Sequence, residues 1–148
     1  MIRFDEKQVR AVGRNTRGVK GIKIKPKDTL ISMDVIEPKD EKTFLLIITK
    51  FGYGKNIRIS EFKVQNRSGI GVRSLKFRKT VKDDAVIDAL TVLKEDEIML
   101  VTLNGTMCRQ KVQNISTQRR ESQGVKIIKP DEKDCVTAME KVIETIEE

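Results

Sequence analysis

Short apolar runs separated by glycine turns recur along this 148-residue chain. The stretch "LLIITKFGYGKNIR" (45–58) turns at Gly52, and "IMLVTLNGTMCRQK" (98–111) turns at Gly105 in the same place. An aliphatic run, a glycine turn and a second, more polar run are typical of a β-hairpin. We therefore predict a hairpin in each of the two stretches.

The two stretches lie 53 residues apart, and a basic turn repeats at the same interval. The pattern Arg-x-x-x-Gly-Val-Lys/Arg occurs over residues 14–20, 67–73 and 120–126. A fixed period of about 50 residues indicates a repeat architecture. Because glycine permits backbone conformations that other residues avoid, we predict that each copy is the turn between one repeat and the next.

Apolar stretches between the basic turns and the hairpins complete the repeat: "TLISMDVI" (29–36), "AVIDALTVL" (85–93) and "DCVTAM" (134–139). Each repeat then has four short strands, so the predicted class is all-β, with four-stranded blades around an axis. We predict that residues 1–13 are the end strand of a preceding blade, 14–66 and 67–117 blades, 118–143 a partial blade and 144–148 an acidic tail.

The end of the chain carries two conflicting patterns. Met139, Val142, Ile143 and Ile146 are spaced as on one face of a helix. The repeat register instead places a strand up to about Ile143. We favour the strand, because tertiary context usually overrides local propensity in a short segment.

Charge is distributed unevenly. Lys and Arg outnumber Asp and Glu by 30 to 22, a net charge of +8. Residues 131–148 hold seven acids and two lysines, which leaves about +13 on the first 130 residues. A basic body of this kind favours an anionic partner such as nucleic acid.

Several chemistries are excluded by residue type. The chain has no histidine, so it cannot form Ser-His or Cys-His pairs or His-ligated zinc sites. Cys108 and Cys135 form no CxxC and are expected to be free, buried thiols in a reducing compartment. The chain shows no signal peptide, no membrane span and no GxxxxGK[ST] loop, so we expect a soluble, cytoplasmic protein without a cofactor or ATPase activity.

The candidate binding residues flank the repeated glycines. Stacked blades would place them in a curved positive stripe that neutralises phosphates without reading bases. The candidates in the basic turns are Arg14, Arg17, Lys20, Arg67, Arg73, Arg119, Arg120 and Lys126, and those that follow the hairpin glycines are Lys55, Arg58, Arg109 and Lys111. Tyr53 lies in a predicted hairpin turn, and no catalytic or metal-binding residue is predicted.

Three long segments resemble one known family. They are "IRFDEKQVRAVGRNTRGVKGIKI" (2–24), "LLIITKFGYGKNIRISEFKVQNRSGIGV" (45–72) and "DEIMLVTLNGTMCRQKVQNIS" (96–116). In this order they resemble the C-terminal domain of the DNA gyrase A subunit, with the related domain of topoisomerase IV ParC a close second. The resemblance implies a β-pinwheel, with this chain as the last half of a six-bladed disc that wraps DNA around its basic rim.

The family's characteristic box, Gln-Arg-Arg-Gly-Gly-Lys-Gly, is degenerate in this chain. The stretch "QNRSGIG" keeps Gln65, Arg67, Gly69 and Gly71 of it, and "QRRESQG" (118–124) keeps its glutamine, its two arginines and its last glycine. In gyrase the intact box lies in the first blade, so the resemblance implies that this chain matches later blades.

Three function classes compete. The first, implied by the resemblance, is a non-catalytic DNA-wrapping module of a bacterial topoisomerase. It would act at the nucleoid with the rest of the gyrase A subunit, which connects it to the gyrase B subunit. The second is a propeller-like scaffold that docks proteins, although the chain has no tryptophan to serve as an anchor. The third is single-stranded nucleic-acid binding, for which five Phe and one Tyr are a thin supply of stacking platforms.

Overall fold

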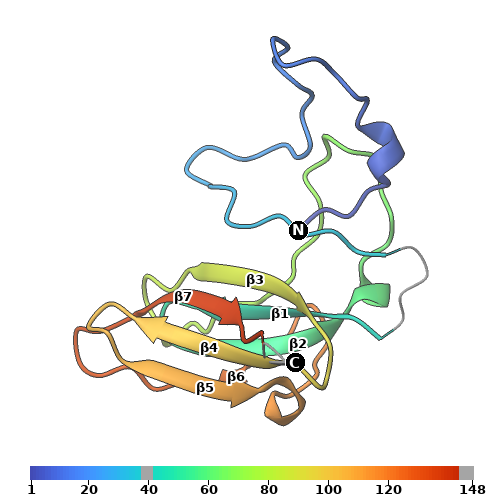
Figure 1. Cartoon of the computed structure of the whole chain (residues 1–148). Helices are drawn as coiled ribbons and strands as arrows, with labels where there is room; N and C mark the ends of the chain where they lie inside the picture. Colours follow the sequence, from blue (N-terminus) through green and yellow to red (C-terminus); the bar gives the residue numbers. More distant parts are fainter. Residues whose placement is uncertain (38–41, 144–148) are drawn as a thin grey trace.

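The computed structural model describes residues 1–37 and 42–143, and its strands form two antiparallel sheets packed against each other (Figure 1). The first sheet has the order β3-β1-β2-β6, with β1 at Phe44–Thr49, β2 at Tyr53–Arg58, β3 at Val86–Val92 and β6 at Val125–Lys126. The second has the order β5-β4-β7, with β4 at Glu97–Thr102, β5 at Met107–Lys111 and β7 at Val136–Lys141. The described residues also form three short 3-10 helices: η1 (Glu6–Gln8), η2 (Ile59–Glu61) and η3 (Val112–Asn114). The predicted all-β class is confirmed.

Both predicted hairpins form. β1 pairs with β2, and β4 pairs with β5, each antiparallel. The turns contain Gly52 and Gly105, whose φ angles are 79° and 85°. Because L-residues rarely adopt positive φ, glycine suits both turns.

Two further predicted strands form as well. Residues 85–93 contain β3, which pairs with β1. The conflict at the end of the chain resolves as a strand: β7 pairs with β4, so that Leu100 lies opposite Met139. Val136 and Met139 are fully buried between the sheets. Pairing with the open edge of β4 and burial of these two side chains stabilise the strand, and they decide against the helix that the spacing of apolar residues would allow.

The predicted strand at 29–36 is wrong, because the described residues of this segment form no strand. β3 pairs with β1, and at the 53-residue offset the strand equivalent to β1 would fall before Met1, so this sequence holds no such strand for 29–36 to pair with. Instead, Ser32 Oγ donates to Ala89 O at 3.0 Å, and Asp34 Oδ2 accepts from Thr91 N at 2.9 Å.

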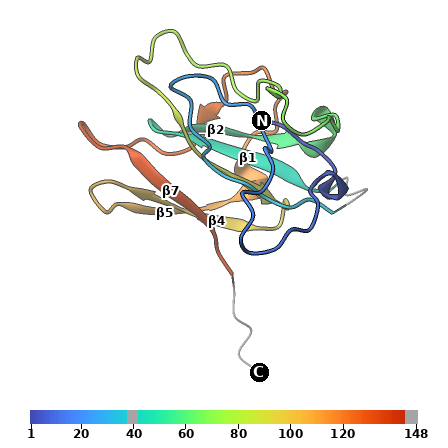
Figure 2. The same ribbon diagram turned by 90° about the horizontal axis from the view of Figure 1, so that it is seen from above.

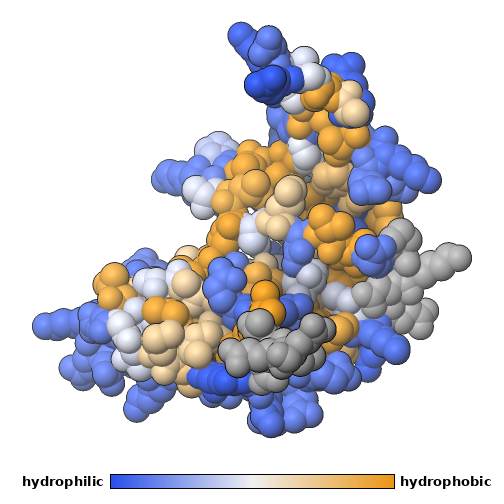
Figure 3. Space-filling view, viewed as in Figure 1, coloured by the Kyte–Doolittle hydropathy of each residue, from blue (hydrophilic) through white to orange (hydrophobic). Residues whose placement is uncertain are grey.

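This segment leaves apolar side chains uncovered. Leu30, Met33 and Val35 are 62%, 87% and 74% exposed. Apolar surface is visible in the middle of Figure 3, above the two sheets. The predicted end strand at 1–13 is likewise not formed, although Met1 exchanges hydrogen bonds with Val72.

Each sheet combines strands from different sequence repeats. The first sheet takes the β1–β2 hairpin from residues 14–66, β3 from 67–117 and β6 from 118–143. The predicted blade ranges therefore describe the repeat in the sequence, and the sheets cross their boundaries. Consecutive repeats are interlocked by this exchange of strands. The predicted tail, 144–148, lies outside the described residues.

β1 lies at the centre of this arrangement. Its even-numbered residues Leu46 and Ile48 pack into the core between the two sheets. Its odd-numbered residues Leu45 and Ile47 pack into a second core with Ile57 on the opposite face. A strand covered on both faces has no polar side, which explains the unbroken run "FLLII" in the sequence.

Candidate nucleic-acid interface

The three repeated basic turns lie in a row, each in contact with the next. Lys23 N donates to Gly69 O at 2.8 Å, and one repeat later Lys76 N donates to Ser122 O at 3.1 Å. Figures 1 and 2 show the N-terminal segment beside the loop that follows η2. We call the combined surface of residues 14–20, 67–73 and 119–126 the turn row.

The glycines of the turn row have the conformation that the sequence predicted. The φ angles of Gly18, Gly71 and Gly124 are 70°, 77° and 73°. A Cβ on Gly71 would lie 2.2 Å from Met1 O, and one on Gly124 would lie 2.7 Å from Gly54 O. Two of the three glycines are therefore required for close backbone approach as well as for their conformation.

Most cations of the turn row point into solvent. The exposed ones are Arg14, Arg17, Lys20, Arg73, Arg119 and Lys126. Lys126 also donates from Nζ to Phe51 O at 3.0 Å, and its Nζ lies 3.8 Å from the centroid of the Tyr53 ring. The row thus presents positive charge from each of the three repeats.

Arg67 and Arg120 differ from these neighbours, because both are half-buried. Arg67 donates from Nε to Gln8 O at 3.0 Å and from Nη1 to Lys20 O at 2.9 Å. Arg120 donates from Nη1 to Arg73 O at 3.3 Å, the same contact one repeat later. Each guanidinium is turned toward the backbone of the preceding basic turn.

Side chains from the 3-10 helices fix the backbone of the same two arginines. Gln8 Oε1 accepts from Arg67 N, and Glu61 Oε2 accepts from Arg120 N, both at 2.9 Å. Gln8 ends η1 and Glu61 ends η2, 53 residues later. Sequence reasoning missed both, and the only signal was the recurrence of a long polar acceptor at the repeat interval.

Lys55 does not lie on the surface with the other candidates. Its side chain is fully buried, and Nζ donates to Arg119 O at 2.7 Å, to Arg120 O at 2.9 Å and to Ser122 O at 2.9 Å. Burial lowers the pKa of Lys55 to about 8, against the attraction of Glu61. The ammonium ion therefore supports the third basic turn from inside, and we leave Lys55 out of the proposed contacts.

The other cations from the hairpins extend from strands. Arg58 lies over the Phe44 ring, 5.7 Å from its centroid. Arg109 and Lys111 both form ion pairs with Glu97, the second at 3.9 Å. This carboxylate offsets part of their charge, so they are weaker candidates for phosphate contacts than the exposed cations of the turn row.

The degenerate box residues support the turn row. Gln65 N donates to Arg3 O at 2.8 Å, and Gln65 O accepts from Gln8 Nε2 at 3.4 Å. Gly69 accepts from Lys23, and Gly71 approaches Met1. In this chain the box residues hold neighbouring segments together.

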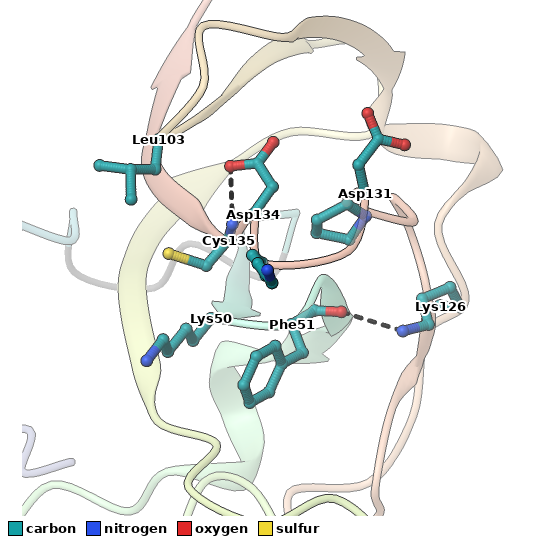
Figure 4. Close-up of a pocket in the computed structure, with 9 residues that line it drawn as sticks. Lys50, Phe51, Leu103, Lys126, Asp131, Asp134 and Cys135 are labelled. Carbon is teal, nitrogen blue, oxygen red and sulfur yellow. Dashed lines mark hydrogen bonds between the residues drawn. The ribbon is translucent and has the colours of Figure 1, made fainter.

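A cavity of about 390 Å³ opens beside the third basic turn (Figure 4). Lys50, Phe51 and Lys126 line one part of it, and Asp134 and Cys135 another. Asp134 Oδ1 accepts from Cys135 N at 2.8 Å, and this and further hydrogen bonds, above all from the Thr102 hydroxyl, lower the pKa of that carboxyl. The hydrogen bonds of Asp134 stabilise a turn, and they do not pair this carboxylate with a nucleophile as a general base.

Residues 1–37 and 42–143 offer little other chemistry. No three His, Cys, Asp or Glu side chains gather there as a metal ion would require. Cys108 and Cys135 are free and half-buried. No helix in these ranges is long and apolar enough to cross a bilayer.

Comparison with known proteins matches most of the chain to one family. The family model "DNA gyrase C-terminal domain, beta-propeller" matches residues 1–37, 43–92 and 96–142. The DNA gyrase A subunit of Escherichia coli (strain K12) is 36% identical over 148 residues, which covers 100% of this chain and 16% of that protein. The DNA gyrase A subunit of Synechocystis sp. is 33% identical over 164 residues, covering 91% and 19%. The chain thus spans less than a fifth of these relatives.

Solved structures agree with this assignment. A C-terminal domain of DNA topoisomerase IV superposes with a TM-score of 0.86 at 27% identity, covering 94% of this chain and 42% of that one. A DNA gyrase A C-terminal domain superposes with a TM-score of 0.79 at 30% identity, covering 95% and 46%. The predicted resemblance and the predicted pinwheel fold are confirmed. The chain belongs to the DNA gyrase C-terminal domain family.

Proposed function

We propose that this chain binds duplex DNA along the turn row and bends it, as a wrapping module of a type IIA topoisomerase. The observation that carries the proposal is the continuous row of three basic turns with exposed cations from each repeat. Cations at regular intervals neutralise successive phosphates, and the release of counterions drives such binding. Phosphate contacts position a protein on DNA without specifying a sequence.

Duplex DNA fits this surface better than a single strand. Single-strand binding proteins stack bases on exposed aromatic rings. Phe44 and Phe62 are buried in the cores, and the Tyr53 ring is contacted by Lys126 and by Arg78, whose guanidinium lies 4.7 Å from the ring centroid. Phe77 is 46% exposed. Cations are plentiful and open stacking platforms are few, which favours recognition of the phosphate backbone.

The relatives are DNA gyrase A subunits, so the rest of such a protein is the proposed partner of this chain. Through it, the chain would act with the gyrase B subunit, in the cytoplasm and on the DNA of the bacterial nucleoid. We assign no catalytic step and no cofactor to the chain itself. Its proposed contribution is to shape the DNA segment on which the catalytic parts act.

A scaffold that docks proteins is the second candidate. The exposed apolar side chains of Leu30, Met33 and Val35 favour it, because apolar patches often mark contact surfaces. DNA binding is preferred because the cations recur with the repeat, whereas this patch occupies one segment only.

The DNA proposal predicts a change in salt dependence. Replacing Arg17, Arg73 and Arg119 with Gln, one exposed arginine from each turn, should flatten the slope of log K against log salt by up to about three, because each phosphate neutralised contributes about 0.9. The loss should be similar on two unrelated duplexes. Salt titrations of wild type and variant by fluorescence anisotropy measure both quantities.

A matched control removes the same charge elsewhere. Arg109, Lys111 and Lys141 each form an ion pair with Glu97 or Asp96. Replacing these three with Gln should change the slope much less. An equal or larger change of slope in the control would indicate that DNA binds along the second sheet and not along the turn row. A wild-type protein without affinity for duplex DNA would refute the proposed function.

A further inference from the structure

Arg67 and Arg120 occupy equivalent positions in two repeats. In both, the guanidinium group is already hydrogen-bonded to backbone carbonyls and is not free to bind a phosphate. Both use Nη1 to bind the carbonyl of a residue 47 positions earlier, Lys20 and Arg73. Those two residues are themselves equivalent, since each ends a Gly-Val-Lys/Arg motif. The same contact is thus formed twice, between successive turns.

The geometry points to a role for these two arginines that deepens, and rests on, the proposed DNA binding. We propose that Arg67 and Arg120 are positioning residues that set the spacing between successive basic turns, and thereby the curvature of the bound duplex. The phosphates would be contacted by their exposed neighbours. In each pair of turns, the arginine of the later turn holds the backbone of the residue that carries the last cation of the earlier turn.

The backbone contacts around the two arginines support this role. The inter-turn bonds from Lys23 N to Gly69 O and from Lys76 N to Ser122 O lie beside them. Arg67 N and Arg120 N are each held by a side chain from a 3-10 helix, Gln8 or Glu61. Each arginine is therefore held at its backbone and binds the preceding turn with its guanidinium, as a fixed spacer requires.

The charge environment and the burial of the two arginines also support a positioning role. The Arg120 side chain is 33% exposed, and its Nη1 also lies 3.4 Å from Glu121 Oε1. Arg67 uses two of its nitrogens on backbone carbonyls. By contrast, Arg119 is exposed on the same turn. A phosphate can approach Arg119 without breaking the inter-turn contact, whereas binding through Arg120 would compete with it.

Arginine is needed for this role because of its shape. The guanidinium presents several N–H donors in a rigid plane, so Arg67 can bind two carbonyls at once. A lysine keeps the charge but has a single flexible ammonium group. Replacing both arginines with Lys therefore separates the two roles: a phosphate contact tolerates the change, and a spacer does not.

The test compares the double variants R67K/R120K and R67Q/R120Q with wild type and with R119Q. The slope of log K against log salt counts phosphate contacts, and energy transfer between dyes at the two ends of a duplex measures bending. We expect both double variants to keep the wild-type slope to within about 0.3, a third of the value for one phosphate. Their energy transfer should fall toward that of free duplex. R119Q should lose about 0.9 of slope and keep the bend.

Amide hydrogen exchange of the free protein provides a readout without DNA. We expect the Lys23 and Lys76 amides to exchange about tenfold faster in both double variants, because the inter-turn bonds open more often, while amides in β1 keep wild-type protection. The unchanged β1 amides show that the variants are folded.

Two results would overturn the proposal. The first is a slope that drops by about two in R67Q/R120Q and is restored in R67K/R120K, since the arginines would then be phosphate contacts. The second is wild-type exchange at Lys23 and Lys76 in both variants, since the arginines would then not hold the turns. If wild type fails to bind duplex, the proposed function fails, and the exchange measurement still decides whether the arginines are spacers.

Discussion

Replacing Lys55 with methionine should lower the free energy of unfolding by about 3 kcal/mol, because buried acceptors of a charged hydrogen bond lose their donor. The Lys55 ammonium group binds three backbone carbonyls and the Ser122 hydroxyl of the third basic turn. Methionine fills a similar volume, so the loss comes from these hydrogen bonds and not from a cavity. Urea unfolding at pH 7, where a group with a pKa of about 8 is mostly protonated, measures the change.

The matched control is Lys63, an exposed lysine that follows the same strand. Replacing Lys63 with methionine should change the free energy of unfolding by no more than about 0.5 kcal/mol, as is usual for surface positions. Equal stabilities of the two variants would show that water satisfies the three carbonyls when Lys55 is removed. The Lys55 variant should also weaken DNA binding if the third turn loses its shape, although Lys55 is not among the proposed phosphate contacts.

Replacing Gly124 with alanine should lower the free energy of unfolding by about 3 kcal/mol. A left-handed backbone conformation costs an L-residue roughly 1–2 kcal/mol. In addition, the new Cβ would lie 2.7 Å from Gly54 O and 3.1 Å from Gly54 C, so the β2–β6 pairing has to shift. Thermal or urea unfolding measures the sum of the two effects.

Gly18 separates the two contributions. It has nearly the same φ, 70° against 73°, but nothing lies within 4 Å of a Cβ placed on it. Its replacement with alanine should therefore cost only about 1 kcal/mol, the conformational part. If the two alanine variants lost equal stability, close approach of the third turn to β2 would contribute nothing.

The repeat was readable in the sequence because it depends on local chemistry. Turn glycines and aliphatic runs have to recur wherever the same backbone recurs. Comparing segments 53 residues apart therefore predicted the strands β1, β2, β3, β4 and β5. The same offset predicted β7 correctly against the helical spacing of Met139 and Val142. Where two patterns conflicted, the one shared by several copies was the better guide.

The same comparison wrongly predicted a strand at 29–36, and the reason is physical. A strand needs a partner, and the sequence of this segment contains no information about whether a partner hairpin is present. Ser32 and Asp34 bind β3 through their side chains, and Met33 remains exposed. The strand propensity of the segment is real, but a β-ladder is a property of two segments and not of one.

The features of the candidate site also fall into two groups, those predictable from the sequence and those that depend on the fold. Which turns are basic, how far apart they recur and why glycine stands in each of them could all be read from the order of the residues. Which cations face solvent depends on the folded chain, because the direction of a long side chain depends on the backbone carbonyls that surround it. Lys55 is drawn inward by Arg119, Arg120 and Ser122, and Arg67 by Gln8 and Lys20, while Arg119 stays exposed. These acceptors come from segments more than 40 residues away, so no local pattern of charge could distinguish the buried cations from the exposed ones.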